Sequence, residues 1–536
     1  MGADEAVYGN FEDVLDTFAE STNVEIVEDT TPSERVLLSE VDRRSAPLQH
    51  LSYAQQLLVK RAAVERQFRR LAQALQTVYT GQKIVEDDGG LLCPVEAVRP
   101  APSVRRFRNK TEYEVGDDEF GEPKALGVRA WVPIRMHGKF NDRPLHAISR
   151  PSEAVLSVDP RREAWATVFQ RYLRDVSSWQ QAYVHKKRRF VDGLSRPISL
   201  VGHYRQFRAR TTQQGEIMVL VVANPDVDLT EQEKADEKRR LADYFIEHAN
   251  REGLRLDSLG FQFCPAWRCS EQQAPVDILY GRRDVTETVK QFRFRISPTA
   301  FFQTNARAAS VLLDTVAEVA QLDASRSVLV DVCAGVGLYS IGLSERVLRS
   351  VGLEIDPAAV EDAAANARLN GVDNATFLAC RAEDETETLL ADQVGSGGEE
   401  EEEDLVVILN PGRWGVPAPL VQALRNCERL RRLVFVTCYP YGPNYRTMFN
   451  LLTTPYKDYK MRPFRLKRVV PLDMFPHTKH CEVVALMERV ESVDGERALR
   501  AAAPPSLALF NSGRRRRLAA LGGRVWLGVT SVLYLL

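Results

Sequence analysis

The sequence predicts an α/β protein, with a mostly parallel, Rossmann-like sheet in the C-terminal half and an α+β region before it. Two observations predict this fold class. Residues 308–490 alternate buried strands with helices, which is the pattern of a parallel sheet covered on both faces. Residues 90–300 alternate short β-type runs with helices. A chain of 536 residues, 44% hydrophobic and 27% charged, is typical of a globular protein with about two to four domains.

The net charge and the cysteine content exclude some classes of protein. A net charge of -2 excludes a strongly basic protein that coats nucleic acid non-specifically, but it allows a local basic surface. Eight scattered cysteines do not make a disulfide framework, which favours a reducing compartment. Cys264 and Cys269 are the closest pair, and no second pair completes a zinc or iron–sulfur site, so no metal is expected.

The N-terminal part begins with a segment that we expect to be disordered, residues 1–44, because it is rich in Asp and Glu and poor in apolar residues. From Ser45 to Leu75, apolar residues recur at near-helical spacing. We interpret this segment as a solvated charged helix, with a nucleic-acid contact as the alternative. The cations expected on its polar face are Lys60, Arg61, Arg66, Arg69 and Arg70.

The α+β region carries several basic clusters. Residues 104–113 alternate basic and aromatic side chains, which on an exposed strand suit phosphates and base stacking. A helix is expected over 161–189, ending in the cationic cluster 185–189. Each cluster alone is also consistent with ordinary surface, but together they favour one positive face that binds nucleic acid. The other expected elements are strands 198–201, 204–210 and 217–223, a hairpin turn at 213–215 and a charged helix at 231–252.

The C-terminal half is expected to place polar side chains at one edge of its sheet. In an open α/β sheet, ligands bind beyond the carboxyl ends of the strands. Strand 433–437 runs into Cys438 there, although an inert buried thiol is the alternative. The other expected elements are strands 328–333, 350–353, 405–409 and 483–487, helices 308–320 and 339–348, a helix opened by Asp356-Pro357, and a solvated loop at 395–404.

A glycine loop follows the first of these strands. Asp331, Gly335 and Gly337 form the pattern Asp-x-x-x-Gly-x-Gly, and Glu354 ends the next strand. Glycines let the backbone approach a ligand, and the Glu354 carboxylate can accept hydrogen bonds from ribose hydroxyls. The pattern suits S-adenosylmethionine better than a dinucleotide or a triphosphate; an ordinary tight turn is the alternative.

Four segments resemble signatures of the RNA uracil-C5 methyltransferases. Residues 292–305 resemble the segment before that family's catalytic domain, and residues 473–482 resemble its C-terminal signature. Thr437-Cys438-Tyr439-Pro440 stands where the family has Ser-Cys-Asn-Pro, and residues 107–113 are similar to its RNA-domain motif. The resemblance covers about residues 45–490. It is closest to the animal mitochondrial type, with pointers at residues 268–273, Asn410-Pro411 in place of Asp-Pro, and His477.

The resemblance implies S-adenosylmethionine-dependent methylation of uridine carbon 5 in RNA, with the T-loop uridine of tRNA as the expected target. Cys438 is the expected nucleophile, because addition of its thiolate to carbon 6 of the base makes carbon 5 nucleophilic. Glu482 is the expected base that then removes the proton from carbon 5, with a surface carboxylate as the alternative. The expected cofactor-binding residues are Gln303, Asp331, Gly335, Gly337, Glu354 and Asn410.

Rival functions stay open. Asn410 lacks the negative charge of the family's Asp, which allows a catalytically weak RNA-binding paralogue; 5-methyluridine formation in mitochondrial ribosomal RNA and a small-molecule methyltransferase are further alternatives. The resemblance suggests a mitochondrial location, but an acidic start is the reverse of a transit peptide, which leaves the cytoplasm or nucleus as alternatives.

The predicted organisation follows from these segments. It comprises a disordered acidic N-terminus (1–44), an α+β RNA-binding region with a leading helix (45–300), a methyltransferase domain (301–490) and a disordered tail (491–536). The apolar stretch 525–536 is 12 residues long, whereas a membrane-spanning helix needs roughly 20 residues. We therefore expect no membrane association. From the basic clusters and the resemblance we expect RNA as the partner and no DNA, and we expect a monomer.

Overall fold

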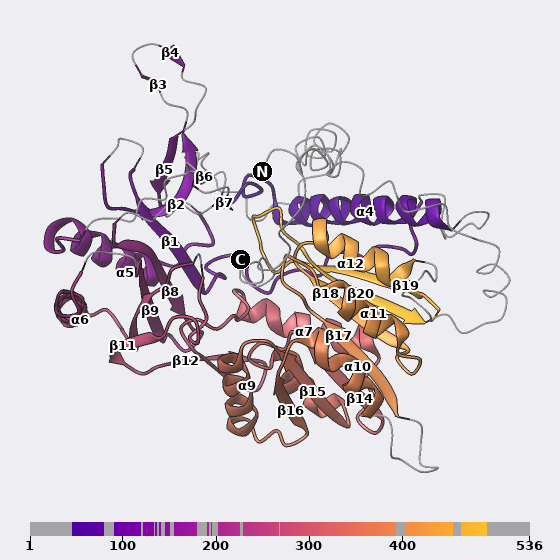
Figure 1. Cartoon of the computed structure of the whole chain (residues 1–536). Coiled ribbons are helices and arrows are strands. Elements are labelled where there is room, and N and C mark those ends of the chain that lie inside the picture. The colour runs from indigo at the N-terminus through magenta and orange to yellow at the C-terminus, as the bar shows by residue number, and fades with distance from the viewer. Residues whose placement is uncertain are drawn as a thin grey trace.

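The protein has two halves, each built around one 7-stranded sheet (Figure 1). The computed structural model describes residues 45–489, except 80–89, 119–121, 133–134, 137–138, 141–144, 151–154, 180–189, 192–193, 196–201, 226–228, 267, 393–402 and 454–461. The predicted disordered ends, the cationic cluster 185–189, strand 198–201 and most of the loop 395–404 lie outside the described residues.

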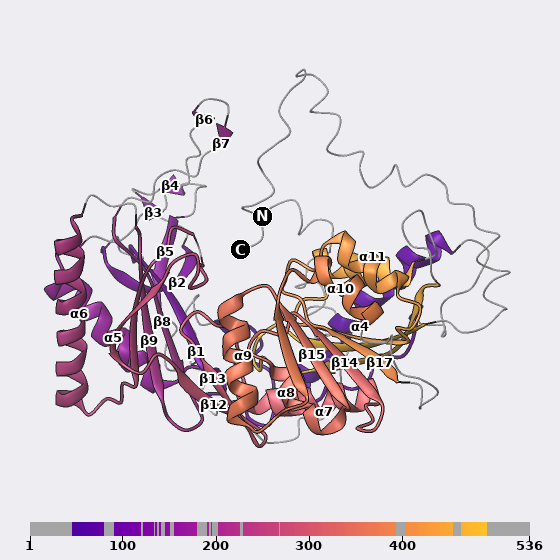
Figure 2. The ribbon, with the colours of Figure 1, turned by 60° about the horizontal axis from the view of Figure 1, so that its bottom comes forward.

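The sheet of the N-terminal half has the strand order β11-β10-β9-β8-β1-β2-β5, and only β9 and β10 pair in parallel within its named ladders. Its strands are β1 (Lys110–Gly116), β2 (Ala125–Val132), β5 (Leu145–Ser149), β8 (Tyr204–Thr211), β9 (Ile217–Ala223), β10 (Ser258–Phe263) and β11 (Val276–Gly281). Helices α5 (Pro160–Arg171) and α6 (Glu231–Glu252) cover one face (Figure 2). Trp165 of α5 stacks on Phe245 of α6 with ring centroids 5.1 Å apart. Short hairpins are β3 (Arg135–Met136) with β4 (Lys139–Phe140), and β6 (Phe190–Val191) with β7 (Leu194–Ser195).

Several predictions for this half are confirmed. Strands β8 and β9 form the expected antiparallel hairpin, with Gly215 at φ +81° in its turn. Helix α6 has the predicted bounds, because Thr230 forms a capping box with Glu233 and Gly253 ends the helix in the left-handed conformation.

Two predictions for this half are wrong. The helix predicted over 161–189 ends at Arg171 and continues as one π-helical turn, Tyr172–Val176. The basic–aromatic segment 104–113 is not one exposed strand, because β1 begins only at Lys110 and the rings of Phe107 and Tyr113 are buried. Exposing large aromatic rings to water costs free energy, so these rings are buried in spite of the alternating sequence pattern. They are therefore not available for base stacking.

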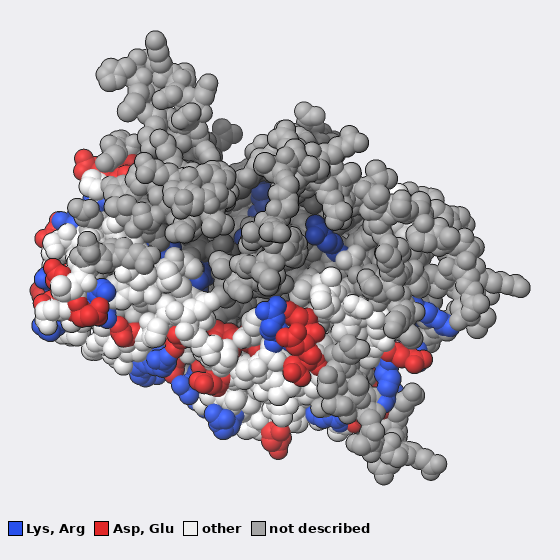
Figure 3. All heavy atoms as spheres, in the orientation of Figure 1, with Lys and Arg blue, Asp and Glu red and all other residues white. Residues whose placement is uncertain are grey.

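The single positive face expected for the α+β region stays a prediction, because its cationic cluster 185–189 lies outside the described residues. On the face drawn in Figure 3, Lys and Arg are interspersed with Asp and Glu. Many of the cations on the described surface have acidic partners, such as Arg255 with Asp257 and Arg171 with Glu252.

The sheet of the C-terminal half confirms the prediction of a mostly parallel sheet. Its order is β16-β15-β14-β17-β18-β20-β19, in which the first five strands are parallel and β20 and β19 are antiparallel to their neighbours. The strands are β14 (Ser327–Val332), β15 (Arg349–Glu354), β16 (Ala375–Ala379), β17 (Asp404–Leu409), β18 (Arg432–Thr437), β19 (Phe464–Leu472) and β20 (Glu482–Arg489).

Helices cover both faces of this sheet. Helices α7 (Ala306–Ala320), α8 (Leu338–Gly342) and α9 (Pro357–Leu369) share one core with the hairpin β12 (Val285–Val289)–β13 (Phe292–Ile296). Helices α10 (Ala382–Asp392), α11 (Ala418–Asn426) and α12 (Gly442–Leu452) belong to the other core. Asp356 caps α9 as predicted. The helix predicted over 339–348 is wrong in length: α8 stops at Gly342 and one 3₁₀ turn, Ser344–Arg346, follows. Asn374 donates to the Ser344 and Val347 carbonyls, 3.0 and 3.1 Å away, which holds this end of the segment.

The leading helix, α4 (Tyr53–Val78), packs on the C-terminal half. Its residues Val64, Phe68 and Leu71 join the core of that sheet, so the grouping of this helix with the α+β region does not describe its packing. Lys60, predicted on the solvated face, is fully buried, and its Nζ donates to Asp473 Oδ1 at 2.6 Å. Sequence spacing fixes one apolar stripe but does not show which polar residue at its border gains a buried partner.

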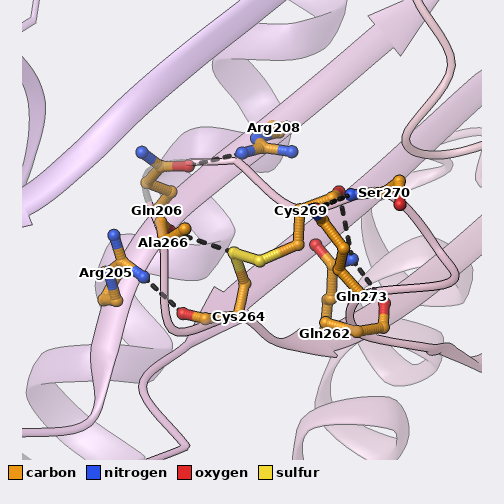
Figure 4. The surroundings of a disulfide bond; sticks show 10 residues. Arg205, Gln206, Arg208, Gln262, Cys264, Ala266, Cys269, Ser270 and Gln273 are labelled. Atoms are coloured by element: carbon orange, nitrogen blue, oxygen red, sulfur yellow. Dashed lines mark hydrogen bonds between the residues drawn. A yellow bond between two sulfur atoms is a disulfide. The ribbon is translucent and has the colours of Figure 1, made fainter. Parts of the chain in front are cut away.

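A disulfide joins Cys264 and Cys269 in the loop between β10 and β11 (Figure 4). The backbone around it is held by polar side chains, since Arg205 donates to the Cys264 carbonyl oxygen and Gln262 donates to the Ala274 carbonyl oxygen at 2.7 Å. One bridge between near neighbours is not a framework, and the reducing compartment stays a prediction. No helix in the described part of the chain is long and apolar enough to cross a membrane.

Candidate active site

The candidate site lies at the edge of the C-terminal sheet where the parallel strands end. Strands β14, β15, β17 and β18 run in the same direction, so the residues that follow them meet at one edge. This places the glycine loop, Glu354, Asn410 and Cys438 along that edge. Glu482 reaches the same edge from the opposite direction, because β20 is antiparallel and Glu482 is its first residue.

The sheet register brings Cys438 and Glu482 together. Thr437 at the end of β18 is paired with Val483, so Cys438 and Glu482 are the next two residues opposite each other. Cys438 is partly exposed, whereas Glu482 is buried. The two side chains interact electrostatically, since the charge of Glu482 contributes to a raised pKa of the Cys438 thiol.

Burial sets the protonation of this pair. It raises the pKa of Glu482 to about 8 and, together with the Glu482 charge, raises the pKa of Cys438 to about 11. The Arg413 guanidinium lowers the pKa of the thiol by its charge and by a hydrogen bond to the Cys438 side chain. Both groups are therefore mainly protonated at neutral pH. Glu482, with a pKa of about 8, can gain or lose a proton near neutral pH.

The segment that presents Cys438 is fixed by a buried amide, Asn444, in the first turn of α12. Its Nδ2 donates to Thr437 Oγ1 at 3.0 Å, to the Tyr439 carbonyl at 3.2 Å and to the Gly412 carbonyl at 3.2 Å. Asn444 thus ties the ends of β17 and β18 together. Our sequence analysis missed this residue; an Asn directly after the Gly442-Pro443 helix start, beside the Cys438 segment, was the available signal.

Asn410 is held by a buried tyrosine. Its Nδ2 donates to the Tyr339 hydroxyl at 3.0 Å, and Tyr339 is 2% exposed. Burial and the charge of Glu482 both raise the Tyr339 pKa, so the hydroxyl stays protonated. Our sequence analysis took Tyr339 only as a helix start, because nothing in its local pattern shows that it reaches the end of β17.

The glycine loop encloses an open space beside an acidic side chain. Gly335 has φ +56°, and a Cβ built there meets no atom within 4 Å. Its N–H donates to Glu354 Oε2 at 2.9 Å, while Glu354 Oε1 accepts from the Asp356 N–H at 3.0 Å. Each carboxylate oxygen retains acceptor capacity for a ligand hydroxyl. The loop can therefore hold an adenosyl group against its backbone.

Asp331 and Gly337 shape this loop from beneath. The Asp331 carboxylate is fully buried and accepts from the Ser340 N–H at 3.1 Å and the Ser340 hydroxyl at 2.9 Å, which anchors the start of α8. Burial raises the pKa of Asp331 to about 7. Gly337 has φ +88° and lies against the Phe377 ring.

Gln303 enters from the segment before α7. The residue is 7% exposed. The backbone carbonyl oxygen of Gln303 accepts a hydrogen bond from Asn109 Nδ2 at 3.1 Å. Among the described residues, no hydrogen bond joins the Gln303 side chain to the other predicted site residues. The Asn109 contact links the N-terminal half to the site. Within the described ranges there is also no group of His, Cys, Asp and Glu that could hold a metal ion.

Comparisons with known proteins agree with this geometry. The sequence profile of the family described as tRNA (Uracil-5-)-methyltransferase matches residues 238–490. The tRNA (uracil-5-)-methyltransferase homolog B of Mus musculus is 32% identical over 447 residues, 83% of this chain and 84% of that protein. The homolog A of Homo sapiens is 32% identical over 471 residues, 86% of this chain and 69% of that protein. The crystal structure of the Pyrococcus abyssi tRNA (uracil-54, C5)-methyltransferase in complex with S-adenosyl-L-homocysteine shares the fold, with a TM-score of 0.52, 22% identity, and coverage of 84% of this chain and 86% of that chain.

Proposed function

The chain belongs to the tRNA (uracil-5-)-methyltransferase family, and we propose that it methylates carbon 5 of the T-loop uridine of tRNA through a transient Cys438 adduct. The family transfers its methyl group from S-adenosylmethionine. The observation that carries the proposal is the pairing of Cys438 with Glu482 at the strand edge that also holds the glycine loop.

The residues at this edge fit the cofactor. The open space beside Gly335 suits an adenosyl group, the Glu354 carboxylate can accept its ribose hydroxyls, and Gln303 and Asn410 lie on the flanking segments. Asp331 and Gly337 fix the loop from beneath. Bound there, S-adenosylmethionine supplies an electrophilic methyl group.

Cys438 starts the reaction. Its partly exposed thiol first loses a proton to water, and the Arg413 guanidinium favours the thiolate. The thiolate then forms a bond to carbon 6 of the uracil ring, and the electron pair of the carbon 5–carbon 6 double bond becomes available at carbon 5. Carbon 5 would use this electron pair to bond to the methyl group of S-adenosylmethionine, and the sulfur would keep the electron pair of the broken sulfur–methyl bond, releasing S-adenosylhomocysteine. The target base must leave its stack to reach the site, as in other enzymes that act on bases.

Glu482 completes the reaction. As a carboxylate it accepts the proton from carbon 5, the electron pair of that bond re-forms the double bond, and the carbon 6–sulfur bond breaks to release Cys438. A pKa of about 8 makes this carboxylate a stronger base than an ordinary glutamate. Its burial keeps bulk water from this proton.

A variant pair of cysteines tests the proposal. Cys438→Ala should reduce methyl transfer from labelled S-adenosylmethionine to tRNA below detection, while cofactor binding is retained. Cys481→Ala is the matched control, because Cys481 is the next buried cysteine in this region and its thiol donates to the Leu472 carbonyl. The control should keep activity within about tenfold of the wild type. Wild-type turnover in the Cys438 variant would refute the mechanism.

A catalytically weak RNA-binding paralogue is a second candidate, and Asn410 favours it. The neutral amide faces the Tyr339 hydroxyl where most of the family has a carboxylate. RNA affinity without methyl transfer by the wild-type chain would support this candidate. The mitochondrial location stays a prediction, which imaging of the tagged full chain would test.

A further inference from the structure

A cavity of about 440 Å³ lies where the N-terminal sheet meets the start of α7. Its walls come from the segment 103–109, the β8–β9 turn and the first turns of α5 and α7. A second cavity of about 390 Å³ shares Gln213 and Arg307 with it, so the two adjoin. We call the larger one the junction cavity. None of the predicted site residues lines it.

Three cations that line the junction cavity have no partner among the described residues. Arg105, Arg106 and Arg307 are exposed, and within the described part of the chain their guanidinium groups make no ion pair or hydrogen bond. Arg106 is held in the left-handed conformation, with φ +51°, where its N–H donates to the Leu156 carbonyl at 2.7 Å. Long cationic side chains that converge without counter-ions favour an anionic ligand.

The two acids of the cavity wall are already occupied. Asp159 pairs with Arg161 at 2.7 Å. Glu287 accepts from the Gln213 N–H at 3.1 Å and from the Thr288 N–H at 3.0 Å. Neither carboxylate therefore serves as the counter-ion of the three unpaired arginines, and the cavity stays positive.

Two helix N-termini add to this positive potential. Helix α5 begins at Pro160 and helix α7 begins at Ala306, and both residues line the cavity. The partial positive charge at a helix N-terminus favours an anion there. The cavity thus combines unpaired guanidinium groups with oriented backbone dipoles, which is the chemistry that recognises phosphate.

The wall of the junction cavity continues into the active site. The Val104 carbonyl lies 2.7 Å from His477 Nε2. Arg108, two residues beyond Arg106, is close enough to Arg413 to interact with it electrostatically, and Arg413 hydrogen-bonds to Cys438. A polyanion whose base reaches Cys438 therefore has its backbone near this segment.

We propose that the junction cavity binds a backbone phosphate of the substrate RNA, with Arg105 and Arg307 as its main cationic contacts. This inference rests on the proposed function for the identity of the RNA as tRNA. It predicts a contact that fixes the RNA at a distance from the reacting base, and it assigns a role to the arginines that the catalytic mechanism does not use.

The test is tRNA binding by the full-length double variant Arg105→Glu/Arg307→Glu, measured by fluorescence anisotropy across a range of salt concentrations. Both positions are exposed, and a Glu in the first turn of α7 suits the helix dipole, so the variant should fold and bind S-adenosylmethionine normally. The Kd for tRNA should rise at least tenfold, and the slope of log K against log salt should fall by about 1, for the one phosphate that is no longer neutralised.

The matched control is Arg346→Glu, an exposed arginine outside the cavity wall, which should bind tRNA like the wild type. Equal affinity and equal salt slope in the double variant and the control would overturn the inference. A free-phosphate site would be shown instead if millimolar inorganic phosphate stabilised the wild type but not the double variant while both bound tRNA equally. Loss of methyl transfer in the wild type would count against the proposed function alone, because the binding measurement needs no catalysis.

Discussion

Glu482 in the C-terminal half and Glu112 in the N-terminal half have pKa values that are shifted in opposite directions. At the edge of the C-terminal sheet, burial raises the pKa of Glu482 to about 8 and that of Asp331 to about 7. On β1 of the N-terminal sheet, burial also opposes the ionisation of Glu112, but nearby cations lower its pKa to about 2. Burial without nearby cations therefore raises the pKa of a carboxyl group, whereas nearby cations keep a carboxyl group ionised.

The partners of Glu112 explain this difference. Lys110 Nζ lies 3.0 Å from one carboxylate oxygen and Arg268 lies 2.5 Å from the other, with Arg208 at 3.7 Å. The same crowding lowers the pKa of Lys110 to about 7, since burial and the neighbouring arginines outweigh the Glu112 charge. Among the described residues, no cation lowers the pKa of Glu482, and burial raises it.

The largest expected effect is on turnover. If Glu482 is the base, Glu482→Gln should reduce steady-state methylation of tRNA by about 10²–10⁴-fold, the typical contribution of a general base. Glu112→Gln should change the maximal rate far less, because a permanently ionised carboxylate does not exchange the proton. The methylation rates of both variants would be measured at saturating tRNA and S-adenosylmethionine. An equal loss of rate in the two variants would contradict the different roles assigned to Glu482 and Glu112.

The contributions of Glu482 and Glu112 to the free energy of unfolding should depend on pH with opposite signs. Glu482 has a folded-state pKa of about 8 against an ordinary value of 4.5, so between these values the unfolded state binds fewer protons. The free energy of unfolding should therefore fall as pH rises from 4.5 to 8, by on the order of 3 kcal/mol. Urea unfolding of Glu482→Gln should lack this fall. An unchanged pH profile in the variant would contradict the raised pKa.

Glu112 should give a smaller effect of the opposite sign. Its pKa of about 2 against 4.5 means that its contribution to stability is complete above pH 4.5 and is lost as pH falls toward 2. Its side chain is 27% exposed, so solvent screening reduces the effect, and Glu112→Gln should cost about 2 kcal/mol at pH 7. Glu231→Gln is the control, because the Glu231 side chain is 90% exposed, and it should leave the free energy of unfolding nearly unchanged.

The fold could be predicted where local patterns and burial agree. The apolar runs of β14, β17 and β18, the bounds of α6 and the start of α9 at Asp356-Pro357 follow from neighbouring residues, and the structure confirms them. The packing of α4 on the C-terminal sheet depends on the Lys60–Asp473 ion pair between residues far apart in sequence. No local pattern contains that information.

The same limit applies to the candidate site. Strand ends and motifs led to Cys438 and Glu482, and the sheet register places them opposite each other. Tyr339 and Asn444 were missed, because their roles arise from contacts with other strand ends. The roles of the cofactor-binding residues remain predictions, with Asp331 placed beneath the loop instead of in its open space.

The most direct test of the covalent mechanism is intact-mass spectrometry of Glu482→Gln after incubation with tRNA and S-adenosylmethionine. Without a base to remove the proton from carbon 5, the mechanism predicts a protein–RNA adduct that carries the transferred methyl group, with peptide mapping locating the bond at Cys438. Methylation by this variant at the wild-type rate, with no adduct at Cys438, would contradict it.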